Sequence, residues 1–314
     1  MTDIRKDSVT FHTVDENAAG QRIDNYLVRQ LKGVPKSHIY RILRSGEVRV
    51  NKGRADASRR LELGDVIRIP PVRIAERGES TVPGTSFPVV YEDEALLVID
   101  KPAGVAVHGG SGVSFGVIEQ LRRGHPEYRY LELVHRLDRE TSGLLMLAKK
   151  RSALVRLHEM MRDNVPDKRY LALGLGQWDS KLRNVKLPLF KYGTPEGERR
   201  VCVSDQGITA HTVFTIKQRF PEFTLVEARL KTGRTHQIRV HMAASGCPIA
   251  GDEKYGDFSE NRALGKRGLK RMFLHAWHLS LPHPLSGEPL ELEAPLPREL
   301  QRFLDILEQH DKVI

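Results

Sequence analysis

A short charged segment between two apolar runs places the strongest constraint on how this chain folds. Residues 135–143 have the sequence His-Arg-Leu-Asp-Arg-Glu-Thr-Ser-Gly and lie between apolar residues 131–134 and 144–147. The first apolar run is short and bounded by polar residues, which is typical of a strand. The charged segment is therefore predicted to be a loop that follows a strand and carries Asp138 near its centre.

Asp138 lies between Arg136 and Arg139 in this segment. Nearby guanidinium groups favour the charged form of a carboxyl group, so we expect Asp138 to be ionised at neutral pH. An ionised Asp is a poor general acid but a usable nucleophile or base. An Arg-x-Asp-Arg sequence also has a plainer interpretation, an ion pair that fixes a turn, so the spacing alone does not establish a catalytic site.

The charge and length of the chain indicate the kind of partner it binds. Its 314 residues leave room for two domains. The formal net charge of +10 favours a polyanionic partner. The sequence contains no apolar run long enough to form a membrane-spanning helix, and residues 1–14 carry no export signal. With only Cys202 and Cys247 present, we expect no disulfide framework or structural zinc site, and a reducing cytoplasm as the location.

Residues 20–80 are predicted to form a small separate domain. Apolar residues recur at helical spacing within 23–31 and again within 36–46. Two short strands are predicted to follow, at 48–50 and 65–69. The faces of these elements that do not carry the apolar residues are rich in Lys and Arg and poor in acidic residues. This excess of positive charge indicates a surface that contacts phosphate groups rather than an ordinary solvated face. The basic residues are Arg22, Arg29, Lys32, Lys36, Arg41, Arg44, Arg49, Lys52, Arg54, Arg59 and Arg60.

Two strings in this region, R-I-D-N-Y-L and S-H-I-Y-R-I-L-R-S-G-E-V-R-V-N, resemble the S4 RNA-binding domain. The resemblance implies two helices packed against a small sheet, with structured RNA bound through the helix face. It predicts RNA as the partner but no particular reaction. Among the basic residues, those expected to contact RNA are Lys36, Arg41, Arg44, Arg49 and Lys52.

The remaining chain is predicted to form a second, larger domain at 88–314. Residues 71–86 mix Pro, Gly, Ser and charge without a period, which predicts an interdomain linker, placed at 81–87. Residues 1–19 are assigned to an N-terminal extension.

The second domain is rich in strand-like runs, and few helices interrupt the later ones. We therefore predict an α+β chain whose second domain has a mixed, mostly antiparallel sheet flanked by helices. One helix is expected to be capped by Ser152, and a final amphipathic helix is expected at 298–308. The predicted strands lie at 89–91, 95–99, 168–173, 211–217 and 223–230.

The charged segment 135–143 resembles the H-R-L-D-R-x-T-S-G signature of the RluA-type pseudouridine synthases. The match is contiguous, and it implies that Asp138 is the catalytic carboxylate. Residues 93–108 resemble the first motif of the family, which supports the catalytic loop. The run at 108–112 and the S4 domain are similar to the branch of the family that modifies 23S ribosomal RNA. The resemblance covers about residues 88–305.

Two further motifs carry candidate site residues. Lys168-Arg169-Tyr170 resembles the K-x-Y motif of the synthases, which implies that Tyr170 lies against the target base and is a candidate proton acceptor. Without that resemblance, Tyr170 would be interpreted as a half-buried core residue. Residues 233–241 resemble G-R-T-H-Q-I-R-V-H, and the match implies that Arg239 pairs with the catalytic Asp.

The local sequence at 233–246 predicts a turn at Gly233 and a helix capped by Thr235 and ended at Gly246. RNA contacts from the second domain are expected at Arg136, Arg139, Arg234 and His236.

No cofactor or metal is expected. The glycines at 109–116 match neither G-x-G-x-x-G nor a Walker A sequence, so they do not indicate a nucleotide site. His236 and His241 are five residues apart, on different helix faces, and His275 and His278 have no third ligand nearby, so structural or RNA-contacting imidazoles are the simpler interpretation. Isomerisation of uridine needs no redox partner or group donor, which agrees with this reading.

The sequence therefore predicts an enzyme that isomerises uridines of 23S rRNA after flipping each target base out of its stack. Its partner would be free 23S rRNA or a large-subunit assembly intermediate, and we expect a monomer. Asp138 could attack C1′ of the ribose or remove a sugar proton, and the sequence leaves both routes open. Two other classes are a ribosome-binding S4 protein with an inactive second domain, and an S4-bearing synthetase, for which ATP-site signatures are missing.

Overall fold

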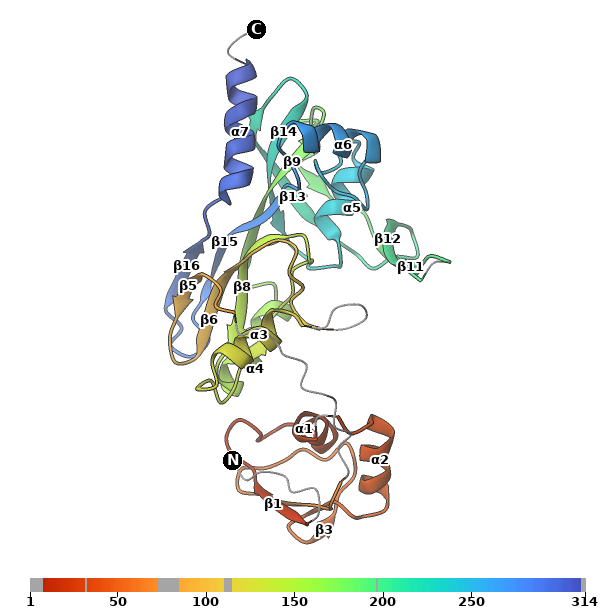
Figure 1. Cartoon of the computed structure of the whole chain (residues 1–314), viewed down its shortest axis with the longest axis vertical. Helices are drawn as coiled ribbons and strands as arrows, with labels where there is room; N and C mark the ends of the chain where they lie inside the picture. Colours follow the sequence, from red (N-terminus) through yellow and green to blue (C-terminus); the bar gives the residue numbers. More distant parts are fainter. Residues whose placement is uncertain (1–7, 32, 73–84, 110–114, 196, 312–314) are drawn as a thin grey trace. The chain divides into compact units, whose positions relative to one another are not determined.

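The computed structural model of the chain describes residues 8–31, 33–72, 85–109, 115–195 and 197–311. The chain divides into two compact units (Figure 1). The first comprises Met1–Val82 with Lys150–Ser152, and the second comprises Pro83–Lys149 with Ala153–Ile314. Lys32, most of the predicted linker, and residues 110–112 of the run at 108–112 lie outside the described residues.

The first unit consists of two helices packed against a four-stranded antiparallel sheet. The buried faces of both helices and the inner face of the sheet share one apolar core, to which Ile23, Leu27 and Ile39 contribute. The strand order is β1-β4-β2-β3. The elements are β1 (Thr10–Thr13), α1 (Ile23–Gln30), α2 (Lys36–Arg44), β2 (Arg49–Val50), β3 (Gly53–Arg54) and β4 (Val66–Ile69).

The prediction that residues 1–19 form an extension outside this unit is wrong for β1. This strand pairs antiparallel with β4 along its full length, with Thr10 opposite Ile69, and Val14 behind it is buried in the core. Its backbone completes a hydrogen-bonded ladder with a strand more than fifty residues away in the sequence. A four-residue run with little apolar alternation does not reveal such a non-local pairing.

The second unit is organised around a long mixed sheet with the strand path β10-β13-β14-β9-β15-β8-β6-β5. Neighbouring strands are antiparallel except β8 and β15, which are parallel, so the predicted mixed, mostly antiparallel sheet is confirmed. The strands on this path are β5 (Val89–Glu92), β6 (Leu96–Lys101), β8 (Ser142–Ala148), β9 (Asp167–Leu175), β10 (Asn184–Val185), β13 (Thr212–Arg219), β14 (Phe223–Leu230) and β15 (Leu274–Pro282).

Two shorter strands extend this sheet, and a hairpin stands apart from it. β7 (Glu132–Leu133) pairs with β8, and β16 (Pro289–Glu293) pairs with β15. A separate hairpin, β11 (Leu189–Gly193) with β12 (Arg199–Val203), projects from the body of the unit beside α5 (Figure 1).

Helices flank the sheet of the second unit as predicted. They are α3 (Val117–Gly124), α4 (Arg151–Arg162), α5 (Gln237–Ala244), α6 (Phe258–Lys266) and α7 (Arg298–Asp311). α7 packs on the sheet through Phe303, whose ring meets that of Phe223 edge to face at 6.0 Å. In the part of the chain that the structure describes, no helix has both the length and the apolar character needed to cross a membrane.

The helix predicted to begin at a Ser152 cap instead begins one residue earlier. Ser152 lies inside α4, and Ala153, Leu157 and Met160 form its buried face. Apolar spacing identified the helix but not its first residue, which follows the end of β8 closely in the sequence.

A glycine at the start of β8 allows the close approach of β15. Gly143 has a φ of +111°, and a Cβ atom at this position would lie 2.2 Å from the carbonyl oxygen of Ala276. Ser142 and Gly143 pair in register with His275 and Ala276. The end of the predicted catalytic loop is therefore joined directly to the central strand of the sheet.

Candidate active site

A pocket of about 300 Å³ brings the predicted catalytic residues together. The loop after β7 supplies Asp138, β9 supplies Tyr170, and the turn and helix after β14 supply His236 and Arg239. Arg136 and Arg234, both predicted to contact RNA, also line this pocket. These groups are far apart in the sequence, and the order of strands in the sheet brings them to one place.

Arg139 does not line the pocket. Its Nε donates to the carbonyl of Gly104 at 3.0 Å, and its guanidinium lies 3.3 Å from Glu140. The side chain is mostly exposed, so it remains a predicted RNA contact on the rim rather than part of the pocket wall.

The loop that carries Asp138 is anchored by a buried lysine. The Nζ of Lys101 donates to the carbonyl oxygens of Pro102, Val105 and Arg139 at 2.7, 2.8 and 3.1 Å. Burial lowers the pKa of Lys101 to about 7, whereas three carbonyl acceptors favour the ammonium form. The backbone directly after Asp138 is thus fixed from the strand that carries the first motif.

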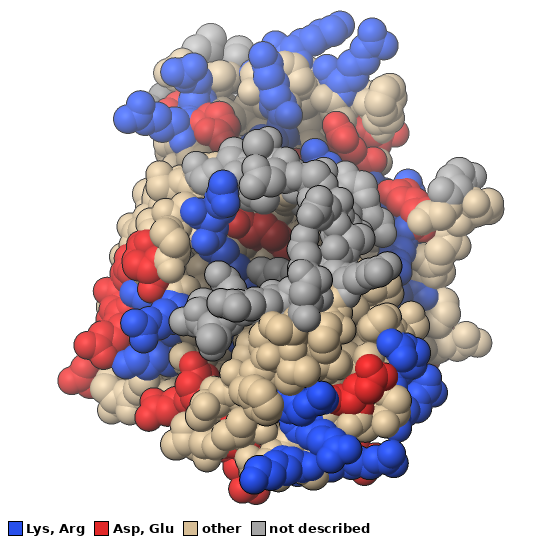
Figure 2. Space-filling model, turned by 60° about the horizontal axis from the view of Figure 1, so that its bottom comes forward, with Lys and Arg blue, Asp and Glu red and all other residues tan. Residues whose placement is uncertain are grey.

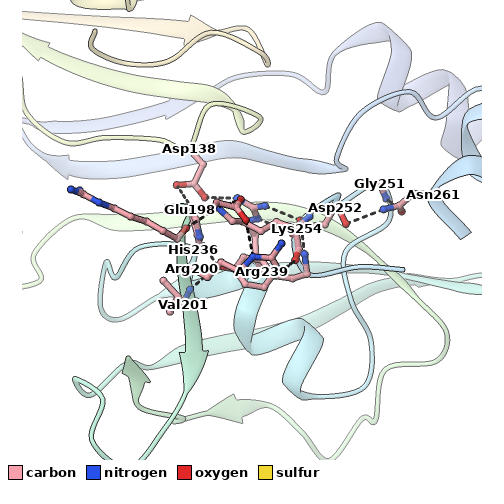
Figure 3. Close-up of polar contacts among 12 residues, drawn as sticks. Asp138, Glu198, Arg200, Val201, His236, Arg239, Gly251, Asp252, Lys254 and Asn261 are labelled. Atoms are coloured by element: carbon pink, nitrogen blue, oxygen red, sulfur yellow. Dashed lines mark hydrogen bonds and ion pairs between the residues drawn. The ribbon is translucent and has the colours of Figure 1, made fainter. Parts of the chain in front are cut away.

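Asp138 faces one nitrogen of Arg239 and the ring of His236 (Figure 3). Its Oδ2 lies 3.3 Å from Nη1 of Arg239, and its Oδ1 lies 3.8 Å from Nε2 of His236. The Asp138 side chain is 18% exposed, so the carboxylate remains open to the pocket while its inner side contacts a cation.

The planar fork of Arg239 is bound by a different carboxylate, Asp252. Nε and Nη2 of Arg239 donate to the two carboxylate oxygens of Asp252, each at 2.7 Å. The Asp252 side chain is fully buried, and it also accepts the backbone N–H groups of Lys254 and Tyr255. Two parallel hydrogen bonds fix the guanidinium plane, so its remaining nitrogen is directed at Asp138.

The electrostatics of this pair follow from its burial and its geometry. Burial acts to raise the pKa of Asp252, but the hydrogen bonds and charge of Arg239 outweigh it and hold the pKa below its usual value. Burial likewise acts to lower the pKa of Arg239, and Asp252 and then Asp138 outweigh it, so the pKa is raised. Arg239 and Asp252 are therefore both charged at neutral pH.

Sequence reasoning missed Asp252 and Tyr255. They lie in the string Gly251-Asp252-Glu253-Lys254-Tyr255-Gly256, which carries a carboxylate and an aromatic residue in a glycine-bounded turn. That composition is a usable signal of a functional turn, but it does not indicate which distant arginine the carboxylate binds.

A hydrogen-bond chain links the projecting hairpin to His236. The hydroxyl oxygen of Tyr255 accepts the backbone N–H of Val201 in β12 at 3.0 Å and lies 2.7 Å from Nδ1 of His236. Because a carboxylate can only accept, the ring proton of His236 is assigned to Nε2, which faces Asp138, and Nδ1 then accepts from the Tyr255 hydroxyl. Burial lowers the pKa of His236 although Asp138 acts to raise it, so the imidazole is neutral at pH 7.

The predicted Thr235 cap is wrong, and α5 begins at Gln237. His236 precedes the helix in a left-handed conformation, with a φ of 54°, which is uncommon for a residue with a side chain. The turn is held instead by the Gln237 carboxamide, which accepts from Thr232 and from the Arg234 backbone, and donates to His211 and Thr212. A side chain inside the helix thus does the work expected of a cap.

Tyr170 lies in the wall of the pocket and is almost fully buried. Burial, and then the nearby charge of Asp138, raise the pKa of Tyr170 above its usual value. Its hydroxyl is therefore protonated at neutral pH, and its ring offers an apolar surface beside Asp138.

The five basic residues of the first unit that were predicted to contact RNA are all exposed. Lys36, Arg41 and Arg44 belong to α2, whereas Arg49 and Lys52 line a groove beside the sheet. In the face shown in Figure 2, Lys and Arg side chains form several groups with acidic residues between them.

Two other basic residues of this unit are used in ion pairs. Arg22 pairs with the buried Asp24 at 2.7 Å, and Arg59 lies 3.5 Å from the buried Asp65. The basic face is accordingly smaller than the sequence indicates.

The histidines weighed as metal ligands have other partners. Both ring nitrogens of His241 are hydrogen-bonded, to Thr212 and to the Leu187 carbonyl, and His275 is held in the same way by Ser142 and the Ala294 carbonyl. Among the residues that the structure describes, no group of three or more His, Cys, Asp or Glu could hold a metal ion.

Comparison with known proteins identifies both units. The profile of the RNA pseudouridylate synthase family matches residues 95–244, and that of the S4 domain matches residues 21–67. The chain is 52% identical to ribosomal large subunit pseudouridine synthase C of Pasteurella multocida over 96% of its length and 95% of that protein. It belongs to the RNA pseudouridylate synthase family.

Other relatives agree with this assignment. The protein of the same name from Escherichia coli is also 52% identical, over 96% of this chain and 97% of that protein. The structure of human RNA pseudouridylate synthase domain containing 4 is similar, with a TM-score of 0.59, 27% identity, and coverage of 70% of this chain and 93% of that one. The predicted family, fold class and enzymatic nature are thereby confirmed, and this synthase carries an S4 domain before its catalytic unit.

Proposed function

We propose that this pseudouridine synthase isomerises specific uridines of 23S ribosomal RNA, with Asp138 as its catalytic carboxylate. The observation that carries the proposal is the meeting of Asp138, Arg239, His236 and Tyr170 in one pocket of a unit of this family. The ribosomal target is supported by the names of relatives that are about half identical over nearly the whole chain.

The reaction requires a series of bond and proton changes at one nucleotide. The bond from N1 of the base to C1′ of the ribose is broken, the base turns, and a new bond joins C5 to C1′. The proton on C5 is then removed, and N1 carries a proton in the product. No electron or group donor enters this balance.

Asp138 has two possible chemical roles in these steps. Its carboxylate could attack C1′ and hold the ribose while the base turns, or it could remove a sugar proton and so drive loss of the base. Both require an ionised carboxylate that is open to the pocket on one side, which agrees with its 18% exposure. Uridine deuterated on the ribose separates the two routes, because only proton removal gives a primary isotope effect.

Arg239 acts on Asp138, and Asp252 acts on Arg239. The cation keeps the carboxylate charged and aimed, and the buried fork between Arg239 and Asp252 fixes the direction of that cation. Preorganised charge of this kind costs no reorganisation when the reaction takes place.

Tyr170 and Arg136 would stabilise the flipped state of the base. The buried ring of Tyr170 would pack against the extruded uracil, and base stacking on an aromatic ring is worth about 1 to 3 kcal/mol. Because its raised pKa keeps it protonated, Tyr170 could accept the C5 proton only by passing its own proton on. The exposed Arg136 at the pocket mouth would fill the space that the flipped base leaves.

The oligomeric state, the location and the form of the rRNA substrate also belong to the proposal. We propose that the enzyme acts as a monomer in the cytoplasm on free 23S rRNA or on an assembly intermediate of the large subunit. Its S4 domain and net charge of +10 suit such a polyanion.

The test is a map of pseudouridine in large-subunit rRNA from cells that lack this protein. Specific sites should be lost, then restored by the wild-type protein and not by Asp138→Asn. An unchanged map would remove 23S rRNA as the substrate and direct the same experiment to other RNAs. Restoration by Asp138→Asn would overturn the catalytic role of Asp138.

A further inference from the structure

A second pocket of the catalytic unit is continuous with the Asp138 pocket. Met161, Lys168, Gly233 and Arg234 line both. The residues that line only the second pocket come from the second half of α4, from just after it and from the start of the loop after β14, and they are His158, Arg162, Asn164 and Thr232. None of these described lining residues is acidic, so we name this the basic pocket.

Lys168 occupies the wall that the two pockets share. Its side chain is half-buried at the start of β9, and the contact of its Nζ within the described structure is with Sδ of Met161 at 3.8 Å. A thioether sulfur is a weak acceptor, whereas an ammonium group has three strong donors. Burial lowers the pKa of Lys168, and among the residues that the structure describes no counter-charge offsets that effect.

Another buried lysine of the same unit, Lys101, has hydrogen-bond partners that Lys168 lacks in the described structure. Lys101 has three carbonyl acceptors between 2.7 and 3.1 Å and needs no further partner. Lys168 has none of these, although leaving donors of a half-buried cation unpaired costs free energy. The contrast indicates that the acceptors for Lys168 are supplied from outside the protein.

The surroundings of Lys168 suit an anion with several acceptor oxygens. Arg162 is exposed at the end of α4, and no ion pair holds it among the residues described. Nε of Arg234 donates to the carbonyl oxygen of Thr209 at 3.2 Å, and this bond does not use the two terminal nitrogens of its guanidinium group. Gly233 has no side chain to cover the ammonium, since even a Cβ atom there would come within 3.9 Å of Nζ.

We propose that the basic pocket binds one backbone phosphate of the RNA strand next to the flipped uridine, with Lys168 as its central contact and Arg162 and Arg234 beside it. The proposal rests on the function proposed above, because the uridine must enter the adjoining Asp138 pocket. A nucleotide seated beside Asp138 carries its flanking phosphates along the shared wall, where three cations from separate elements converge. The site would fix the register of the strand and leave the choice of base to the other pocket.

The test couples a protein change to a phosphate change. A 23S rRNA transcript is assembled by splinted ligation around a synthetic segment that carries one neutral methylphosphonate linkage near a mapped target uridine. With the wild-type enzyme, one linkage position should lower kcat/KM by about tenfold, as expected for the loss of a charge-assisted hydrogen bond. With Lys168→Met, natural RNA should show a similar loss, and the neutral linkage at that position should cause no further loss.

Controls separate this outcome from general damage. Lys217→Met removes an exposed lysine of β13 that lines neither pocket, and it should leave the linkage profile unchanged. Lys168→Arg keeps the charge and should retain the sensitive position. Arg162 is exposed, so Arg162→Ala should not disturb folding. This variant should lose its sensitivity to the neutral linkage at the same position as Lys168→Met.

Two results would overturn the proposal while the proposed function stands. One is a wild-type enzyme that modifies the rRNA but is indifferent to every neutral linkage. The other is a neutral linkage that, at the position sensitive in the wild type, still causes its full additional loss with both Lys168→Met and Arg162→Ala. Absence of pseudouridine with wild-type enzyme and natural rRNA would instead count against the proposed function itself.

Discussion

The two units of this synthase hold charge in opposite ways. In the catalytic unit, Asp138, Arg239 and Asp252 form a row in which Arg239 is fixed between two carboxylates, with Asp252 buried and Asp138 open to the pocket. In the S4 unit, Lys36, Arg44 and their neighbours are exposed on a helix and a sheet edge. The first arrangement specifies one geometry for the carboxylate that we propose to react, whereas the second offers several interchangeable contacts to a polyanion. Single substitutions should therefore be severe in the first and mild in the second.

The largest effect is expected from Asp138→Asn in purified enzyme. The amide keeps the size of the side chain but is neither a nucleophile nor a base, so single-turnover rates should fall by about 10⁴-fold. RNA affinity should be unchanged, because binding depends on the cations around the site. Asp163→Asn, an exposed carboxylate just after α4, is the matched control and should retain full rate. A parallel loss of affinity and rate would mean that Asp138 contributes to binding rather than chemistry.

Next in size is Asp252→Asn, which leaves the buried guanidinium of Arg239 without its anion. The free energy of unfolding at pH 7 should fall by about 3 to 5 kcal/mol. The pKa of Asp252 is below its unfolded value, so its contribution is present above about pH 4 and is lost as pH falls through the folded pKa. The difference in unfolding free energy between wild type and variant, measured by urea titration, should therefore become smaller as the pH is lowered.

Asp257→Asn provides the comparison for that stability measurement. Asp257 is an exposed cap of α6, and Asn caps a helix about as well as Asp, so its unfolding free energy should hardly change. If Asp252→Asn had an equally small effect on the unfolding free energy, Asp252 would not be what fixes Arg239.

A smaller effect is expected from Tyr255→Phe, which removes the hydroxyl between Val201 and His236. The variant should lose about 1 kcal/mol of stability, the usual value for one hydrogen bond. A hydrogen bond donated to Nδ1 favours neutral imidazole, so the pKa of His236 should rise, as followed by NMR titration. Tyr192→Phe, on an exposed residue of β11, should change neither quantity. An unmoved His236 titration would place the Tyr255 proton elsewhere.

The smallest effect per residue is expected on the S4 face. Replacing Arg41 and Arg44 together with Ala should weaken rRNA binding and lower the slope of log affinity against log salt by about 1.5, without altering the rate at saturating RNA. Arg298→Ala with Arg302→Ala, on the exposed side of α7, controls for net charge. If both double variants bound identically, the α2 face would not be the RNA contact surface.

Sequence predicted the elements that local patterns encode. The helices of the S4 domain, the strands around residues 96–101 and 223–230, and the loop carrying Asp138 follow from apolar spacing and from a contiguous motif. Tyr170 and Arg239 were located through motifs of the same kind, and the structure places them in one pocket.

The parts that sequence did not predict depend on contacts between distant residues. β1 exists because β4 pairs with it, and Asp252 has its role because an arginine thirteen positions earlier turns its fork toward it. The start of α5 is set by Gln237, whose carboxamide reaches back to a turn and across to His211. Propensities at Thr235 or Thr10 contain no information about those partners.

The parallel pairing of β8 with β15 has a consequence for when the enzyme becomes active. Ser142, four residues after Asp138, hydrogen-bonds with His275 and Arg271, more than 125 positions further along the chain. During synthesis, Met1–Val82, which form the S4 unit together with Lys150–Ser152, have emerged long before β15 exists. A nascent chain can thus carry nearly all of its S4 unit while the loop with Asp138 still lacks the strand that fixes it, so we expect isomerisation only when translation of this protein is nearly finished.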